Sequence, residues 1–144
     1  MLQSRFEIAR SMEEGDHAAK QMALELYEEL IREGNENACW HAGSLCHNDG
    51  DYARAAYYMK KLPTDSTACN ILGMYYLNGM GTKVNKMMAL TWFRRGALLG
   101  NAECQYEAGK LLMGQDDFEC KGFLELALGN GIGKAQRLLD MECN

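Results

Sequence analysis

The sequence predicts an all-α protein built from stacked helical hairpins. Its 144 residues include one proline and fifteen glycines. Proline breaks helix interiors, so its rarity favours long helical stretches, and the strong helix formers Ala, Leu, Met, Glu and Lys are abundant. A similar segment also recurs three times at a spacing typical of two-helix repeats.

The first half of the repeat is a small residue, an apolar cluster and a glycine five positions after the small residue. It occurs in ENACWHAGSLCHNDG, STACNILGMYYLNGM and AECQYEAGKLLMGQD. The small residues are Ala38, Ala68 and Cys104, and the glycines are Gly43, Gly73 and Gly109. Because these glycines lie 30 and 36 residues apart, the pattern indicates a solenoid of helix-turn-helix units.

The second half of the unit also repeats. KQMALELYEEL, from Lys20, matches KMMALTWFRRG, from Lys86, and DYARAAYYMKK, from Asp51, has the same character. A glycine just past a helix suits the left-handed conformation that ends it. Three glycine-asparagine pairs predict such turns: Gly34-Asn35, Gly100-Asn101 and Gly129-Asn130.

These signals predict four helical hairpins and a closing helix, GKAQRLLDMEC, within a single domain covering residues 1–144. The expected helices are 2–13, 17–33, 36–48, 51–61, 66–78, 85–99, 102–113, 117–128 and 132–142. Small residues should let paired helices approach closely while large ones fill the gaps between hairpins. The expected interior residues are Ala42, Leu45, Tyr58, Leu72, Tyr75, Ala89, Trp92, Phe93, Ala108 and Leu111.

The middle of the chain resembles a Sel-one-like repeat. LGMYYLNGMGTKVNKMMALTWFRRGALLGNAECQYEAG carries its G-x-x-Y, its G-x-G loop, its A-x-x-W-F and its closing A-x-x-G-N-A. The preceding unit lacks the G-x-G insertion and is similar to a tetratricopeptide repeat, with Gly43, Gly50-Asp51-Tyr52 and Ala55 at that family's positions. The resemblance is strong over residues 35–109 and weaker at both ends. It implies a short right-handed α-solenoid of about four helix-turn-helix repeats plus a C-terminal capping helix.

Charge and hydropathy exclude several classes of function. The net charge of −5 argues against nucleic-acid binding, which needs a basic stripe to displace counterions. The longest apolar stretches fall far short of the roughly 18 residues that a membrane span requires. The first fifteen residues contain no long apolar segment, so we expect no signal peptide and a cytoplasmic location.

The six cysteines form no C-x-x-C pair, which argues against zinc-ribbon and redox motifs. In cysteine-rich secreted relatives, each repeat pairs a cysteine on its first helix with one on its second. Here the second-helix position of the best repeat is Ala97, so that disulfide cannot form. We therefore expect small buried thiols, with no metal and no cofactor.

The resemblance implies that the first helix of each hairpin lines a concave, partner-binding groove. Trp40 offers a large contact surface of the kind found in binding hot spots, unless the N-terminal hairpin packs over it. Met74 and Leu77 suit either an adaptable apolar contact or core filling. The expected groove residues are Asn37, Trp40, His41, Ser44 and His47, then Thr67, Asn70, Ile71, Met74 and Leu77, then Glu103, Tyr106, Glu107, Lys110 and Met113.

No convergent catalytic or metal-binding set emerges from the sequence. His41 and His47 are six residues apart, about 240° around a helix axis, and Cys46 points elsewhere again. The adjacent acids Glu13-Glu14 and Asp116-Asp117 diverge on a helix or turn. GMGTKVNK has the wrong spacing for a phosphate-binding loop.

The sequence therefore predicts a non-catalytic adaptor or scaffold, monomeric, that binds a partner protein in its groove. The acidic balance permits a basic partner. The alternative is a bacterial immunity protein that neutralises a cognate toxin by direct binding, which the small size and negative charge suggest. A hydrolase, as suggested for cysteine-rich relatives, is disfavoured because no nucleophile and base converge.

Overall fold

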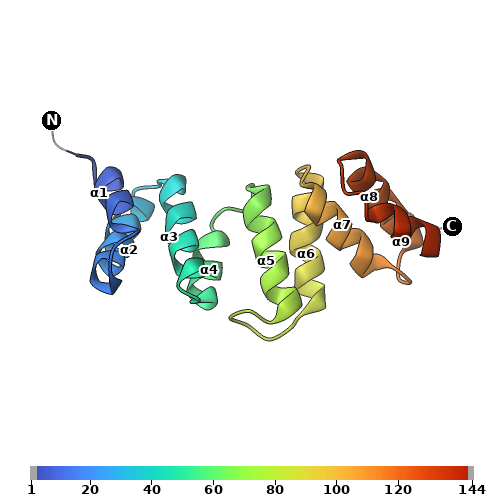
Figure 1. Cartoon of the computed structure of the whole chain (residues 1–144), viewed down its shortest axis with the longest axis horizontal. Helices are drawn as coiled ribbons and strands as arrows, with labels where there is room; N and C mark the ends of the chain where they lie inside the picture. The colour runs from blue at the N-terminus through green and yellow to red at the C-terminus, as the bar shows by residue number, and fades with distance from the viewer. Residues whose placement is uncertain (1–2, 143–144) are drawn as a thin grey trace. The chain divides into compact units, whose positions relative to one another are not determined.

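The computed structural model describes residues 3–142, and within that range the regular structure consists of nine helices (Figure 1). Every predicted helix is present, which confirms the all-α prediction, although the predicted start at Leu2 lies outside the described residues. The helices are α1 (Arg5–Met12), α2 (His17–Arg32), α3 (Glu36–Asn48), α4 (Tyr52–Met59), α5 (Ser66–Asn78), α6 (Lys86–Leu98), α7 (Ala102–Leu112), α8 (Asp117–Gly129) and α9 (Ala135–Glu142).

The chain divides into two compact units, Met1–Leu62 and Pro63–Asn144. In the first unit, helices α1 to α4 pack each on the next, and in the second unit helices α5 to α9 do the same. Helix α5 also contacts α7, so the first helices of two successive hairpins are neighbours. The units thus contain the predicted hairpins α1–α2, α3–α4, α5–α6 and α7–α8, with α9 packed on α8.

The helix starts follow from local capping. Each of α1 to α8 begins after a residue whose side-chain oxygen accepts a hydrogen bond from a backbone N–H of the first turn. Such bonds satisfy donors that have no partner inside the helix. The capping residues are Ser4, Asp16, Asn35, Asp51, Asp65, Asn85, Asn101 and Asp116.

Two of the three predicted glycine-asparagine turns are confirmed and the third is wrong. Gly34 and Gly100 adopt left-handed backbone angles, with φ of 88° and 95°. Gly129 instead ends α8, and the left-handed residue is Gly131, with φ of 96°. The N–H of Gly131 bonds to Leu128 and continues the turn, which also delays the start of α9 from the predicted residue 132 to Ala135.

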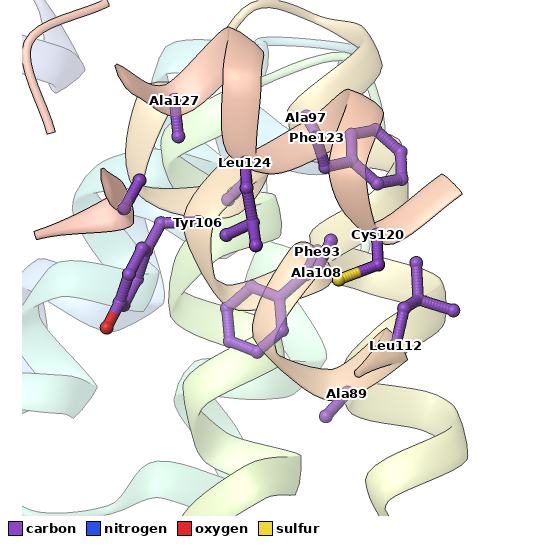
Figure 2. Close-up of a cluster of buried hydrophobic side chains, with 12 residues drawn as sticks. Ala89, Phe93, Ala97, Tyr106, Ala108, Leu112, Cys120, Phe123, Leu124 and Ala127 are labelled. Atoms are coloured by element: carbon purple, nitrogen blue, oxygen red, sulfur yellow. The ribbon is translucent and has the colours of Figure 1, made fainter. Parts of the chain in front are cut away.

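The predicted interior is confirmed except at one position. Ala42, Leu45 and Tyr58 are buried in the first unit, and Leu72, Tyr75, Ala89, Trp92, Phe93 and Ala108 are buried in the second. Leu111 is only partly buried, and Leu112 takes its place in the core cluster shown in Figure 2. Residue 112 lies four positions after Ala108 and therefore continues the buried face of α7, whereas residue 111 lies at its edge.

The repeated glycine marks the closest approach of the two helices in a hairpin. A β-carbon at Gly73 would lie 2.5 Å from Cε1 of Phe93 on α6. At Gly109 it would lie 2.7 Å from Cγ of Leu124 on α8, and at Gly43 it would lie 2.8 Å from a methyl of Met59 on α4. The repeat therefore needs glycine because each of these positions faces a large side chain of the second helix.

Candidate protein-binding surface

The α3 residues predicted to face a partner are all at least partly accessible. Asn37 is exposed, and Trp40, His41, Ser44 and His47 are partly exposed. We call Asn37, Trp40, Ser44 and His47 the α3 face. His41 is set apart because its ring is occupied by contacts within the first unit.

His41 lies under the N-terminal hairpin. Its Nδ1 is 3.0 Å from Oε1 of Glu13, and the same oxygen accepts a hydrogen bond from the Tyr27 hydroxyl. The imidazole stacks on Tyr27, with ring centroids 5.7 Å apart, and meets Phe6 edge-on at 5.2 Å. Burial, reinforced by Glu13, raises the pKa of Tyr27 above its ordinary value. These contacts indicate that His41 holds α3 against α1 and α2.

Glu13 is a residue whose role sequence reasoning missed. The adjacent pair Glu13-Glu14 diverges as predicted, with Glu14 exposed and the Glu13 side chain 22% exposed. Nothing in the local sequence distinguishes the inward acid, because its partners lie 14 and 28 residues away.

The two histidines of α3 turn toward different neighbours. The ring of His47 meets Tyr52 edge-on at a centroid distance of 5.4 Å, whereas His41 contacts Glu13. Across residues 3–142, no three His, Cys, Asp or Glu side chains gather closely enough to hold a metal ion.

In the second unit, neighbouring helices α5 and α7 present the remaining predicted residues. Asn70, Ile71, Met74 and Leu77 of α5 are partly exposed, and Met74 and Leu77 also pack against the core cluster. On α7, Glu103 and Lys110 are exposed and Glu107 is partly exposed. We call these seven residues, four on α5 and three on α7, the α5–α7 face. Of the two flanking residues that were also predicted, Thr67 is exposed and Met113 is partly exposed.

Tyr106 was predicted to be accessible, but the structure buries it. Its side chain is 8% exposed and belongs to the core cluster in Figure 2. Lys134, in the loop before α9, places its Nζ 4.4 Å from the Tyr106 ring centroid and 3.9 Å from Oε2 of Glu103. Tyr106 is buried because the segment around α9 packs near it. The repeat pattern of α7 carries no information about that segment, so it could not predict this burial.

Glu107 is the most distinctive charged group of the α5–α7 face. Its partial burial raises the pKa of the carboxyl, against the opposing effect of Lys110 and Lys134. Within the described part of the chain, its carboxylate accepts no hydrogen bond. Such a group is suited to pairing with a basic side chain from another molecule.

The five cysteines that the structure describes are all buried: Cys39, Cys46, Cys69, Cys104 and Cys120. Cys143 lies outside the described residues. Burial raises the pKa of Cys46 to about 11 and that of Cys104 to about 12. A buried thiol with a raised pKa is a poor nucleophile because the reactive thiolate is scarce.

These thiols predict that stability falls above pH 9. In the unfolded chain the thiols ionise near the ordinary value of 9.0, so from pH 9 upward the unfolded state binds fewer protons than the folded state. Raising the pH from 7 to 10 should then cost about 1.4 kcal/mol for each of Cys46 and Cys104. Denaturant unfolding at both pH values measures this loss. In Cys104→Ala, the loss of unfolding free energy between pH 7 and pH 10 should be smaller. An unchanged loss would show that ionisation of the Cys104 thiol does not contribute to it.

No helix within residues 3–142 combines the length and apolar character needed to span a membrane.

Comparison with solved structures identifies the fold. The chain is similar to a Sel1 repeat protein from Oxalobacter formigenes, with a TM-score of 0.70 and 24% identity over 83% of this chain and 38% of that one. It is also similar to c5321, a protective antigen of uropathogenic Escherichia coli strains displaying an SLR fold. That match has a TM-score of 0.65 and 19% identity, and covers 91% of this chain and 31% of the antigen.

The chain thus spans less than two fifths of either protein, and the similarity establishes an all-α Sel1-like repeat fold. No protein-family model and no curated protein sequence matches it.

Proposed function

We propose, from the Sel1-like repeat fold, that the chain is a non-catalytic protein-binding module of the adaptor or scaffold type. Folds of this kind typically serve protein interaction. The observation that carries the proposal is the partial exposure of polar and apolar side chains at corresponding positions of α3, α5 and α7. Each unit contributes its own contact surface, the α3 face in the first and the α5–α7 face in the second.

The chemistry of the α5–α7 face favours a partner segment that carries both apolar and basic side chains. Ile71, Met74 and Leu77 supply partly exposed apolar surface, and methionine adapts readily to different shapes. Glu107 lies in a partly desolvated position where a cation gains more than in water. The net charge of −5 adds long-range attraction for a basic partner.

Trp40 provides the test on the α3 face. We expect Trp40→Ala to weaken partner binding by about tenfold or more, because a partly exposed tryptophan is a frequent hot-spot residue. The full-length chain, immobilised, would capture its partner from cell lysate, and the affinity of the identified partner would then be measured by calorimetry. Met87→Ala is the control, because Met87 is 82% exposed but lies on α6.

Stability measurements separate binding from folding at this position. Trp40→Ala should destabilise the fold less than Trp92→Ala, since Trp92 is 9% exposed. Unchanged affinity in Trp40→Ala would remove the α3 face from the proposed surface. If Met87→Ala weakens partner binding as much as Trp40→Ala does, the contact does not depend on the first helices of the hairpins.

A second variant tests the preference for basic partners. Glu107→Gln removes the charge but keeps the shape of the side chain, so loss of affinity should be largest at low salt and shrink as salt is added. If neither Glu107→Gln nor added salt changes the affinity for the partner, the preference for a basic partner is contradicted.

A further inference from the structure

Gly122 differs from the other glycines in the interiors of the described helices; Gly129, the last residue of α8, is left out of this comparison. At Gly43, Gly73, Gly96 and Gly109, an added β-carbon would come within 2.8 Å of a neighbouring side chain. At Gly122, in the middle of α8, it would meet nothing within 4 Å. Glycine lowers helix stability relative to alanine, and no packing contact within residues 3–142 requires a glycine at this position.

The space beside Gly122 is an open, largely apolar hollow of about 860 Å³ that is lined by residues of α8 and its capping residue Asp116. Phe118 lies one turn before the glycine with 92% of its side chain exposed, and Leu126 lies one turn after it with 52% exposed. We call Phe118, Gly122 and Leu126 the α8 stripe. An almost fully exposed phenylalanine beside a second exposed apolar residue is characteristic of a contact surface.

The arrangement fits a facing helix. Phe118, Lys121, Gly122 and Glu125 line the hollow and are spaced i, i+3, i+4 and i+7. Four residues at this spacing form the hole that receives one side chain of a neighbouring helix in knobs-into-holes packing. Because glycine forms the floor of this hole, a large apolar side chain can enter it.

The charges around the stripe favour a basic partner. Glu119 is already paired, with an oxygen 2.6 Å from Nε of Arg94, and Asp116 caps α8 by accepting from the Glu119 N–H at 3.0 Å. Glu125, which also lines the hollow, is exposed and makes no ion pair within the described residues, and Lys121 is the basic residue of this lining. The rim therefore keeps an excess of negative charge.

We propose that the α8 stripe docks an amphipathic helix of a partner protein. One apolar side chain of that helix inserts over Gly122 between Phe118 and Leu126. Lysine or arginine residues on its flank lie beside Glu125. The site shares no residue with the α3 face or the α5–α7 face, so its test is independent of the proposed function.

The test uses two synthetic peptides and the full-length chain. One is an amphipathic helical peptide of leucine and lysine with leucines at the i, i+3, i+4, i+7 spacing, and the other replaces each lysine by glutamate. Fluorescence anisotropy should show binding of the lysine peptide and at least tenfold weaker binding of the glutamate peptide.

Two variants locate the binding site on α8. Gly122→Gln fills the hollow with a neutral side chain that favours helix, and Phe118→Ala removes one wall. Each should weaken binding of the lysine peptide by about tenfold, while Met87→Ala, which truncates an 82% exposed side chain on α6, should change it by less than about twofold. Thermal unfolding should show Gly122→Gln to be at least as stable as the parent chain.

Several results would overturn the proposal. The first is that the lysine peptide does not bind, and the second is that both peptides bind equally well. The third is that Met87→Ala and Phe118→Ala weaken binding of the lysine peptide to the same extent. A concentration-dependent dimer in analytical ultracentrifugation that disappears in Phe118→Ala would assign the stripe to a second copy of the chain instead.

Discussion

Phe93→Ala is expected to lower the free energy of unfolding by about 3–5 kcal/mol, the usual cost of truncating a buried aromatic side chain. Phe93 is 0% exposed and packs within the core cluster of the second unit. Its removal would leave a cavity between α5, α6 and the helices that follow, because the surrounding helices relax only partly. Denaturant unfolding followed by far-ultraviolet circular dichroism measures the loss.

Phe118→Ala is the matched control for this prediction. It is the same substitution in the same unit, but Phe118 is 92% exposed. Its effect on stability should stay within about 0.5 kcal/mol. Comparable losses in both variants would mean that burial of Phe93 contributes little to the fold.

Gly73→Ala is expected to destabilise the chain by about 2 kcal/mol. An added β-carbon would lie 2.5, 2.6 and 2.7 Å from three atoms of the Phe93 ring, and overpacking a rigid buried ring costs up to about 3 kcal/mol. The better helix propensity of alanine offsets about 1 kcal/mol of that cost. The same denaturant experiment measures the difference.

Two other glycines calibrate this effect. Gly43→Ala should cost less, because its β-carbon meets the flexible end of Met59, which can move aside. Gly122→Ala, with nothing within 4 Å, should raise stability by about 0.5–1 kcal/mol. If Gly73→Ala also raised stability, the close approach of α5 and α6 at this point would be wrong.

A double-mutant cycle isolates the contact between the two residues. In the Phe93→Ala background the added methyl group of Gly73→Ala has free space, so it should become neutral or stabilising. The coupling between the two substitutions should therefore reach about 2–3 kcal/mol. Additive effects would show that Gly73 is constrained by something other than the Phe93 ring.

The sequence by itself determined the helices and their pairing into hairpins. Asn35, Asn85 and Asn101 cap helices through bonds to residues three positions away, and Gly34 and Gly100 end helices through their own backbone angles. These signals act over a few residues, so they can be identified from the sequence alone. The recurrence of Gly43, Gly73 and Gly109 likewise indicated where paired helices meet.

Only the tertiary structure decided which side chains remain accessible. Tyr106 occupies a position expected to be exposed, yet Lys134 and the core around α9 cover it. His41 is held by Glu13 and Tyr27, and the exposed stripe around Gly122 follows from the absence of any neighbour on that side of α8 in the described chain. The exposure of a side chain depends on helices that are distant in sequence. A repeat pattern, in contrast, predicts the same exposure for equivalent positions of every repeat, whatever packs against them.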